Sequence, residues 1–279
     1  MSDSEDLETG VPLLESSPSA TPEPSAKTST KRKREDGTVV ESKRAAKKKK
    51  SKKTKYEGDA DLDLEAGINH AIGKMDGRLL ADYVAQRTKR FESDLSLMEL
   101  EEKYLPEKSF RDTTKWDKPR NLENLPDFLQ HFASTQARTK QLDSTPKAAG
   151  SPHTIVVTGA GLRAADLTRS LRKFQTKEST VAKLFAKHIK LKDAIEFVKK
   201  TKFGIAVGTP ARLTDLVQAG ALSLDKVHRI MVDSSHIDQK KRGILDMKET
   251  QIPLIGFLNL KGLKDRYGQD SRGVDLLFY

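Results

Sequence analysis

The chain contains 279 residues, with 51 lysines and arginines against 40 aspartates and glutamates, a formal net charge of +11, and no cysteine. The lack of cysteine excludes disulfides, thiol catalysis and cysteine-ligated zinc. No apolar run reaches membrane-spanning length, and the first residues are acidic where a secretory signal would be positive and then apolar. We therefore expect a soluble, intracellular protein without a membrane partner, and the basic excess favours a polyanion, most often nucleic acid.

The charge is distributed unevenly along the chain. Residues 1–30 carry six acids against Lys27 and are rich in Ser, Thr and Pro, so they bury too little apolar surface to fold. Residues 31–55 hold 13 basic and 3 acidic residues, and residues 151–279 hold 23 and 13. We predict a disordered tail over residues 1–58, a helical arm and docking segment over 59–150, and one α/β domain over 151–279.

The basic part of the tail contains two clusters of like charge. Such clusters are typical of nuclear or nucleolar localisation signals and of tails that bind polyanions, although a solvated charge run that only aids solubility has the same composition. The clustered residues are Lys31, Arg32, Lys33, Arg34, Lys43, Arg44, Lys47, Lys48, Lys49, Lys50, Lys52 and Lys53. They predict localisation to the nucleus and nucleolus.

The arm shows helical periodicity. Apolar residues recur at steps of three and four, which predicts helices over Leu79–Phe91 and Leu95–Tyr104, the second ended by Pro106. Trp116 and the stretch Leu122–Phe132 are expected to anchor the arm to the following domain. The pattern leaves two uses open for these side chains, ordinary core packing and a face for a partner protein.

The remaining sequence alternates between short apolar runs and amphipathic segments. Strands are predicted over residues 155–157, 181–185, 203–207, 227–232, 252–258 and 274–278. Helices are predicted over residues 162–174, 191–200 and 211–219. Strands that alternate with helices of about ten residues indicate a parallel, doubly wound sheet covered on both faces.

Two loops at predicted strand ends carry glycine, then the start of a helix, then an arginine on its first turn. Helix N-termini attract anions, and an arginine offers two parallel donors to a phosphate, so the two loops together predict a cradle for successive phosphates of an RNA strand. The alternative is that Thr-Pro is simply good helix-start chemistry. The predicted RNA-binding residues are Gly159, Gly161, Arg163, Gly208, Thr209, Pro210 and Arg212.

The segment Thr209–Arg212 and the box Asp233, Ser234, Ser235 and His236 resemble, in order and spacing, motifs of the first RecA-like domain of DEAD-box helicases. In those motifs Thr-Pro-Gly-Arg contacts RNA, and Asp-Glu holds magnesium and activates water. Here a serine hydroxyl stands in place of the second carboxylate and cannot serve as that base. The sequence also lacks a G-x-x-x-x-G-K-[ST] phosphate loop. This resemblance implies a RecA-like scaffold that binds without turning over ATP, with no cofactor and no small-molecule substrate.

A more particular resemblance combines the basic tail with Lys74–Tyr83, Asp94–Leu100 and the altered box Val232–His236. Together these segments resemble the nucleolar, helicase-like subunit family of the 90S pre-ribosome, the small-subunit processome. The resemblance implies a non-enzymatic role in rRNA maturation and ribosome assembly. It also implies pre-ribosomal RNA and processome proteins as partners.

Two other functions compete with this one. The run from Gly159 to Ala164 satisfies G-x-G-x-x-A between a strand and a helix, as in dinucleotide-dependent enzymes, but no acidic residue ends the next predicted strand to hold a ribose. The second alternative is a pure protein-interaction adaptor, whose basic surface would be incidental. Against that, residues 163–202 hold 12 basic and 4 acidic residues. His188, His228 and His236 do not have metal-ligand spacing, so no metal site is expected.

Overall fold

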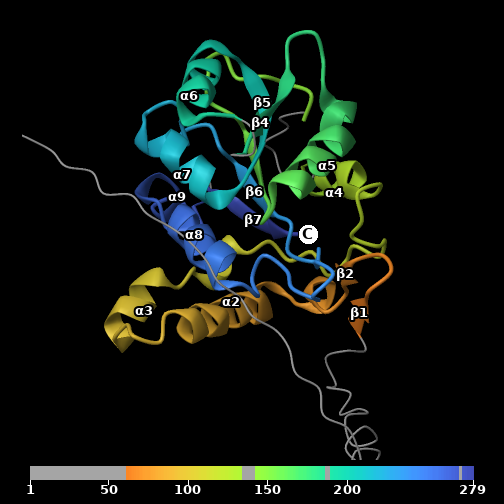
Figure 1. Cartoon of the computed structure of the whole chain (residues 1–279), viewed down its shortest axis with the longest axis vertical. Coiled ribbons are helices and arrows are strands. Elements are labelled where there is room, and N and C mark those ends of the chain that lie inside the picture. Colours follow the sequence, from red (N-terminus) through yellow and green to blue (C-terminus); the bar gives the residue numbers. More distant parts are fainter. Residues whose placement is uncertain (1–60, 134–141, 186–188, 270–271) are drawn as a thin grey trace, which may run out of the picture. The chain divides into compact units, whose positions relative to one another are not determined.

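A five-stranded, all-parallel sheet forms the centre of the computed structural model, which describes residues 61–133, 142–185, 189–269 and 272–279 (Figure 1). The strand order is β4-β5-β3-β6-β7. Their bounds are β3 Thr154–Val157, β4 Thr180–Leu184, β5 Phe203–Gly208, β6 Arg229–Val232 and β7 Asp275–Phe278. The predicted fold class, an α/β domain with a doubly wound parallel sheet, is confirmed. The predicted disordered tail and its basic clusters lie outside the described residues, as does His188.

The helices that connect the strands lie on both faces of the sheet. Right-handed crossovers place α5 on one face, and α6, α7 and α8 on the other (Figure 1). The bounds are α5 Gly161–Leu171 with a 3-10 turn at Arg172–Phe174, α6 Leu191–Lys200, α7 Pro210–Gln218, α8 Lys248–Leu258 and α9 Lys261–Lys264. Two hydrophobic cores result, because successive strand side chains alternate between the faces.

One predicted strand is wrong. Residues 252–258 lie within α8, where Gln251, Leu254, Ile255 and Leu258 are buried at the three- and four-residue steps of a helix. The run is apolar nearly throughout, and a short apolar run does not distinguish a buried strand from a buried helix. α8 also contains Pro253, a residue that is unfavourable inside a helix because it lacks a backbone N–H. The chain therefore continues from β6 through α8 to β7, as a parallel crossover requires.

Residues 61–133 form the arm, which packs against the sheet and against α8. Its elements are β1 Leu62–Asp63, β2 Ile68–Asn69, a 3-10 turn at Ile72–Lys74, α2 Gly77–Phe91, α3 Leu97–Lys103, a 3-10 turn at Glu107–Ser109 and α4 Leu125–Ala133. The predicted arm helices are thus confirmed with shifted ends. Asp76 accepts a hydrogen bond from the Leu79 N–H, and Ser96 forms a capping box with Glu99, so each helix begins at a side-chain cap.

The arm is tied to the rest of the unit by long-range contacts. The Gln251 amide donates to the Thr88 hydroxyl at 2.8 Å, joining α8 to α2. Phe128 is buried in one cluster with Val156 and Leu167, its ring lies 4.6 Å from that of Tyr279, and Trp116 packs against the same cluster, so the predicted anchors do pack on the domain. Within the described residues no helix is long and apolar enough to cross a membrane.

The two edge strands of the sheet, β7 and β4, differ in whether a described segment of the chain pairs with them. At β7, Phe110 forms an isolated parallel bridge with Leu276, and the Arg111 N–H donates to the Leu276 carbonyl at 2.9 Å. The arm therefore covers that edge. At the opposite edge, no described segment pairs with the outer side of β4.

Candidate functional site at the carboxyl end of the sheet

The centre of the sheet contains a topological switch point. β3 and β6 are neighbours, but the connection after β3 runs toward β4 and the connection after β6 runs toward β7. In open α/β sheets, ligands bind in the crevice at such a point, outside the carboxyl ends of the strands. Thr158 follows β3 here, and Asp233 follows β6. The altered helicase box therefore lies where a ligand would be expected.

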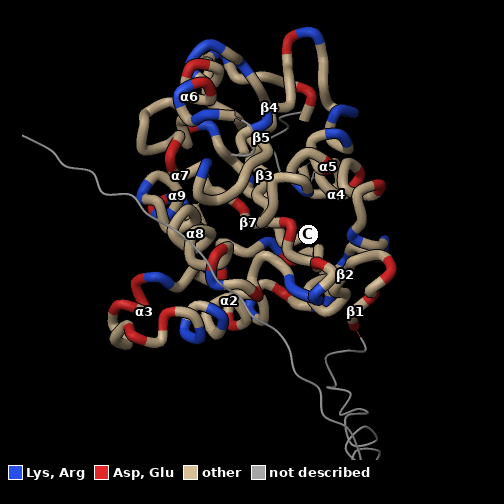
Figure 2. The backbone as a smooth tube through the Cα atoms, viewed as in Figure 1, with Lys and Arg blue, Asp and Glu red and all other residues tan. Residues whose placement is uncertain are grey.

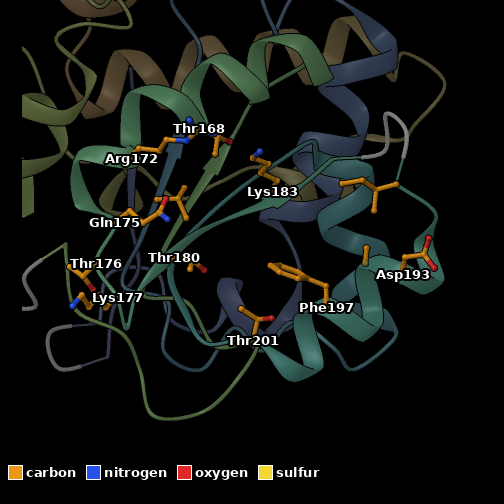
Figure 3. Close-up of a pocket in the computed structure, with 13 residues that line it drawn as sticks. Thr168, Arg172, Gln175, Thr176, Lys177, Thr180, Lys183, Asp193, Phe197 and Thr201 are labelled. Atoms are coloured by element: carbon orange, nitrogen blue, oxygen red, sulfur yellow. The ribbon is translucent and has the colours of Figure 1, made fainter.

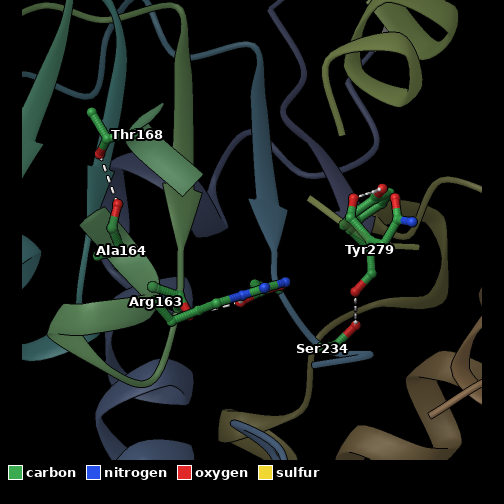
Figure 4. Close-up of polar contacts among 8 residues, drawn as sticks. Arg163, Ala164, Thr168, Ser234 and Tyr279 are labelled. Atoms are coloured by element: carbon green, nitrogen blue, oxygen red, sulfur yellow. Dashed lines mark hydrogen bonds and ion pairs between the residues drawn. The ribbon is translucent and has the colours of Figure 1, made fainter. Parts of the chain in front are cut away.

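An internal ion pair fills this crevice. The Asp233 carboxylate accepts hydrogen bonds from Arg163 Nε and Nη2, each at 3.0 Å, and from the Thr158 hydroxyl at 2.8 Å. Figure 4 shows the Arg163 side chain extending from the start of α5 to the end of the neighbouring strand. The Asp233 side chain is 1% exposed and that of Arg163 is 12% exposed. The carboxylate is thus neutralised and removed from solvent, so a metal ion would have to displace the guanidinium to reach it.

The two serines of the box bind the end of the chain. The N–H groups of Ser234 and Ser235 donate to the Tyr279 carbonyl at 2.8 and 2.7 Å, and the Ser234 hydroxyl donates to the same oxygen at 3.1 Å (Figure 4). The Tyr279 phenol in turn donates to the Asn121 carbonyl. Both serines of the box therefore donate hydrogen bonds that hold Tyr279 beside the end of β6.

The start of the arm covers the box from outside. Ile68 forms an antiparallel bridge with His236, the Asn69 N–H donates to the Ser235 carbonyl at 2.7 Å, and the Ile237 N–H donates to the Gly67 carbonyl at 3.0 Å. Burial, with added repulsion from Arg163, lowers the pKa of the His236 imidazole below its usual 6.5. No group of carboxylates and histidines able to hold a metal ion occurs in the part of the chain that the structure describes.

The two loops of the predicted cradle lie side by side at the carboxyl ends of the strands. β3 and β5 are adjacent, with Val157 opposite Gly208. Gly161 begins α5, and Pro210 begins α7 with Thr209 as its N-cap. The Thr209 side chain makes no capping hydrogen bond. A Cβ at Gly208 would lie 2.4 Å from the Leu184 carbonyl, so this glycine is required by close strand packing.

The two arginines of the predicted cradle point inward. Arg163 pairs with Asp233, and Arg212, which is 8% exposed, donates from Nη2 to the Ile189 carbonyl at 3.0 Å. The Nη1 atom of Arg212 is buried without a hydrogen-bond partner among the described residues. Neither guanidinium is presented to solvent as a free phosphate ligand. Gly159 and Gly161 are half-buried at the surface of the same edge.

Sequence reasoning missed the residues that close the box. Thr158 follows an apolar strand directly, which is a usable signal for a strand-end ligand. Tyr279, Gly67 and Asn69 carry no such signal, because their contacts to the box join segments more than 40 residues apart.

Comparison with known proteins places the chain in a family. A family model described as "CMS1: U3-containing 90S pre-ribosomal complex subunit" matches residues 20–279. The chain belongs to the CMS1 family. The family description places its members in ribosome biogenesis, in agreement with the resemblance drawn from the basic tail, Lys74–Tyr83, Asp94–Leu100 and the altered box together.

Curated members of the CMS1 family match along most of the chain. Protein CMS1 of Chaetomium thermophilum is 52% identical over 249 residues, which cover 89% of this chain and 96% of that protein. Protein cms1 of Schizosaccharomyces pombe is 30% identical, covering 72% and 69%. Human Protein CMSS1 is 26% identical, covering 82% and 73%.

Among solved structures, the chain is similar to the yeast DEAD-box splicing factor Prp28, with 19% identity, a TM-score of 0.33, and coverage of 46% of this chain and 27% of that one. It is also similar to domain 2 of the DEAD-box helicase Mss116p bound to an RNA duplex, with 15% identity, a TM-score of 0.31, and coverage of 56% and 47%.

Proposed function

We propose that this protein is a non-catalytic, RNA-associated component of the small-subunit pre-ribosome that acts in rRNA maturation in the nucleolus. Membership in the CMS1 family supports the assignment of this protein to the pre-ribosome, since the family is described as a subunit of the U3-containing 90S pre-ribosomal complex. Pre-ribosomal RNA and processome proteins are the partners that follow from this proposal.

The buried Arg163–Asp233 ion pair carries the non-catalytic part of the proposal. Nucleotide hydrolysis of the helicase type needs a carboxylate that reaches a metal ion and a second one that activates water. Here Asp233 is held by an arginine, and Ser234 is 4% exposed and bound to Tyr279. Both positions are used for holding the fold together.

The charge of the folded part supports RNA association. The excess of ten basic residues in 151–279 remains when the tail is set aside, and it favours a polyanion. The carboxyl end of the sheet that carries Gly159, Gly161 and Thr209 is our candidate surface, with the first N–H groups of α5 and α7 facing phosphates, whereas Pro210 is buried. Arg163 and Arg212 would then support these loops from within.

Ultraviolet crosslinking of the N-terminally tagged full chain in growing cells, with sequencing of the RNA and location of the crosslinked peptides, tests this proposal. We expect pre-ribosomal RNA joined to peptides around Gly159 or Thr209. Crosslinks confined to residues 31–55 would reject the cradle, and absence of pre-ribosomal RNA would reject RNA association. A parallel titration of the full chain with Mg-ATP, using an active DEAD-box protein as positive control, should show no saturable binding.

A protein-docking role has its own supporting observation. Leu97 and Met98 at the start of α3 are 69% and 78% exposed, whereas Leu100 on the same helix is buried. These two adjacent side chains offer a contiguous apolar contact to a partner protein. Exchanging both for Gln should leave thermal stability unchanged and reduce co-sedimentation of the full chain with pre-ribosomal particles if α3 docks there; unchanged co-sedimentation would reject this surface.

A further inference from the structure

A groove of about 1240 Å³ runs along the β4 edge of the sheet, where no described segment pairs, and β4 is separated from β6 by β5 and β3 (Figure 3). Its residues come from α5 and the loop that follows it, from β4, and from α6. None of them belongs to the predicted cradle or to the box. The groove is thus a separate feature of the domain.

The floor of this groove is the edge strand β4. Parallel pairing with β5 uses every second N–H and C=O of an edge strand and leaves the others facing outward. No described segment pairs with them. An edge of this kind is a template for a further strand.

The two walls of the groove differ in chemistry. On the α5 side lie the exposed cations Arg172 and Lys183, with Lys177 in the adjoining loop. On the α6 side lie Ile189, Ala194 and Phe197, the last of which is 42% exposed. Asp193 also stands on the α6 side, so an anionic group is disfavoured there.

Lys183 has a specific place in this arrangement. It lies on β4 between Ala182 and Leu184, which are buried against the α6 face, so its own side chain projects toward the α5 face. A lysine on an edge strand opposes pairing with an unselected apolar strand. It favours a strand that places a carboxylate next to it.

Figure 2 shows lysines and arginines on α6 and on the loop between α5 and β4, interspersed with acidic residues. The run 163–202, which supplies most of the groove, holds 12 basic and 4 acidic residues. A segment of opposite charge would therefore be drawn to this edge of the sheet.

We propose that this groove binds an extended, acidic segment of a partner protein. The segment pairs with β4 and becomes a sixth strand of the sheet. Alternate side chains of an added strand face opposite walls. The segment that fits alternates acidic residues, which face Arg172 and Lys183, with apolar residues, which face Ile189 and Phe197. RNA fits less well, because it would use the cations but neither the strand edge nor the apolar wall.

The test uses the full chain and a fluorescein-labelled peptide of four Asp-Val repeats, with binding followed by anisotropy. The control peptide has the same composition in two blocks, four Asp and then four Val. Because a strand pairs through every second N–H, two further peptides carry N-methyl groups on all Asp or on all Val amides. We expect saturable binding of the alternating peptide, weaker binding of the block peptide, and loss of binding for one methylated series but not for the other.

Matched variants locate the site. The double change Arg172→Glu and Lys183→Glu should weaken binding of the alternating peptide at least about tenfold, whereas Lys226→Glu with Lys248→Glu, which alters two exposed lysines outside the groove by the same charge, should not. Phe197→Ser should weaken it as well without changing the salt dependence.

Two results would overturn the proposal. Equal binding of the alternating and block peptides would mean that charge alone is recognised. Loss of binding to a uridine 12-mer in the groove variant, together with no binding of the alternating peptide, would make the groove an RNA site.

Discussion

Arg163 and Asp233, 70 residues apart in the sequence, form a two-pronged ion pair that joins the start of α5 to the end of β6. The pair lies between β3 and β6, the two neighbouring strands from which the chain connections run in opposite directions across the sheet. It gives the acidic residue of the altered box a structural partner in place of a ligand.

Removal of the Arg163 side chain should therefore destabilise the folded domain strongly. Arg163→Ala leaves the Asp233 carboxylate buried with only Thr158 as partner, and the free energy of unfolding should fall by about 3–5 kcal/mol. Urea denaturation of the full chain measures this. The double variant Arg163→Ala with Asp233→Ala should recover part of the loss, since no unpaired charge remains, and a double variant no more stable than the single one would contradict this account.

Restoration of the missing carboxylate should not restore an enzyme. Ser234→Glu places a second charge beside Asp233 in a site that is 4% exposed and removes the hydroxyl bound to Tyr279. The midpoint of thermal unfolding should fall by several degrees, with no gain in Mg-ATP binding or hydrolysis. Gln218→Glu, which adds a carboxylate at an exposed position of the same domain, serves as the control and should melt like the parent.

His236 predicts a pH dependence of stability. Burial lowers its pKa in the folded state below the usual 6.5, so the unfolded chain binds the proton more readily. The contribution of this residue is therefore complete above pH 6.5 and decreases as the pH falls below that value. Chemical denaturation of the full chain between pH 7.5 and about 5 should show a steeper loss for the parent than for His236→Gln. Parallel curves would contradict the prediction.

Arg120 occupies a position at which lysine should support the stability of the fold much less well than arginine. It is 5% exposed, donates to the carbonyls of Phe278 and Thr113, and lies over the Phe128 ring at 5.5 Å. Burial lowers its pKa to about 10. Arg120→Lys keeps the charge but loses the planar fork, and it should cost about 1.5–3 kcal/mol of stability. Hydrogen exchange should show the loss as increased opening of residues 110–124; unchanged protection there would contradict this role.

The strand-to-helix alternation was predictable because local pattern determines it. Ile155, Val181 and Ile230 stand in short apolar runs bounded by polar or glycine residues, and these runs became strands. Residues 252–258 were not predictable as a helix, because they contain no polar residue and the sequence therefore shows no amphipathic stripe. The direction of Arg163 and Arg212 was equally out of reach, since each meets its partner only after the sheet has assembled.

The contact between the Arg111 N–H and the Leu276 carbonyl has a kinetic consequence. The arm is synthesised long before β7, and its contacts to Gln251, Leu276 and Phe278 each join positions more than 150 residues apart. Contacts of such long range slow folding, because the connecting loop must close before they form. Until β7 has been synthesised, the apolar side chains of the arm therefore lack the partners that bury them in the folded domain, which exposes the nascent chain to aggregation.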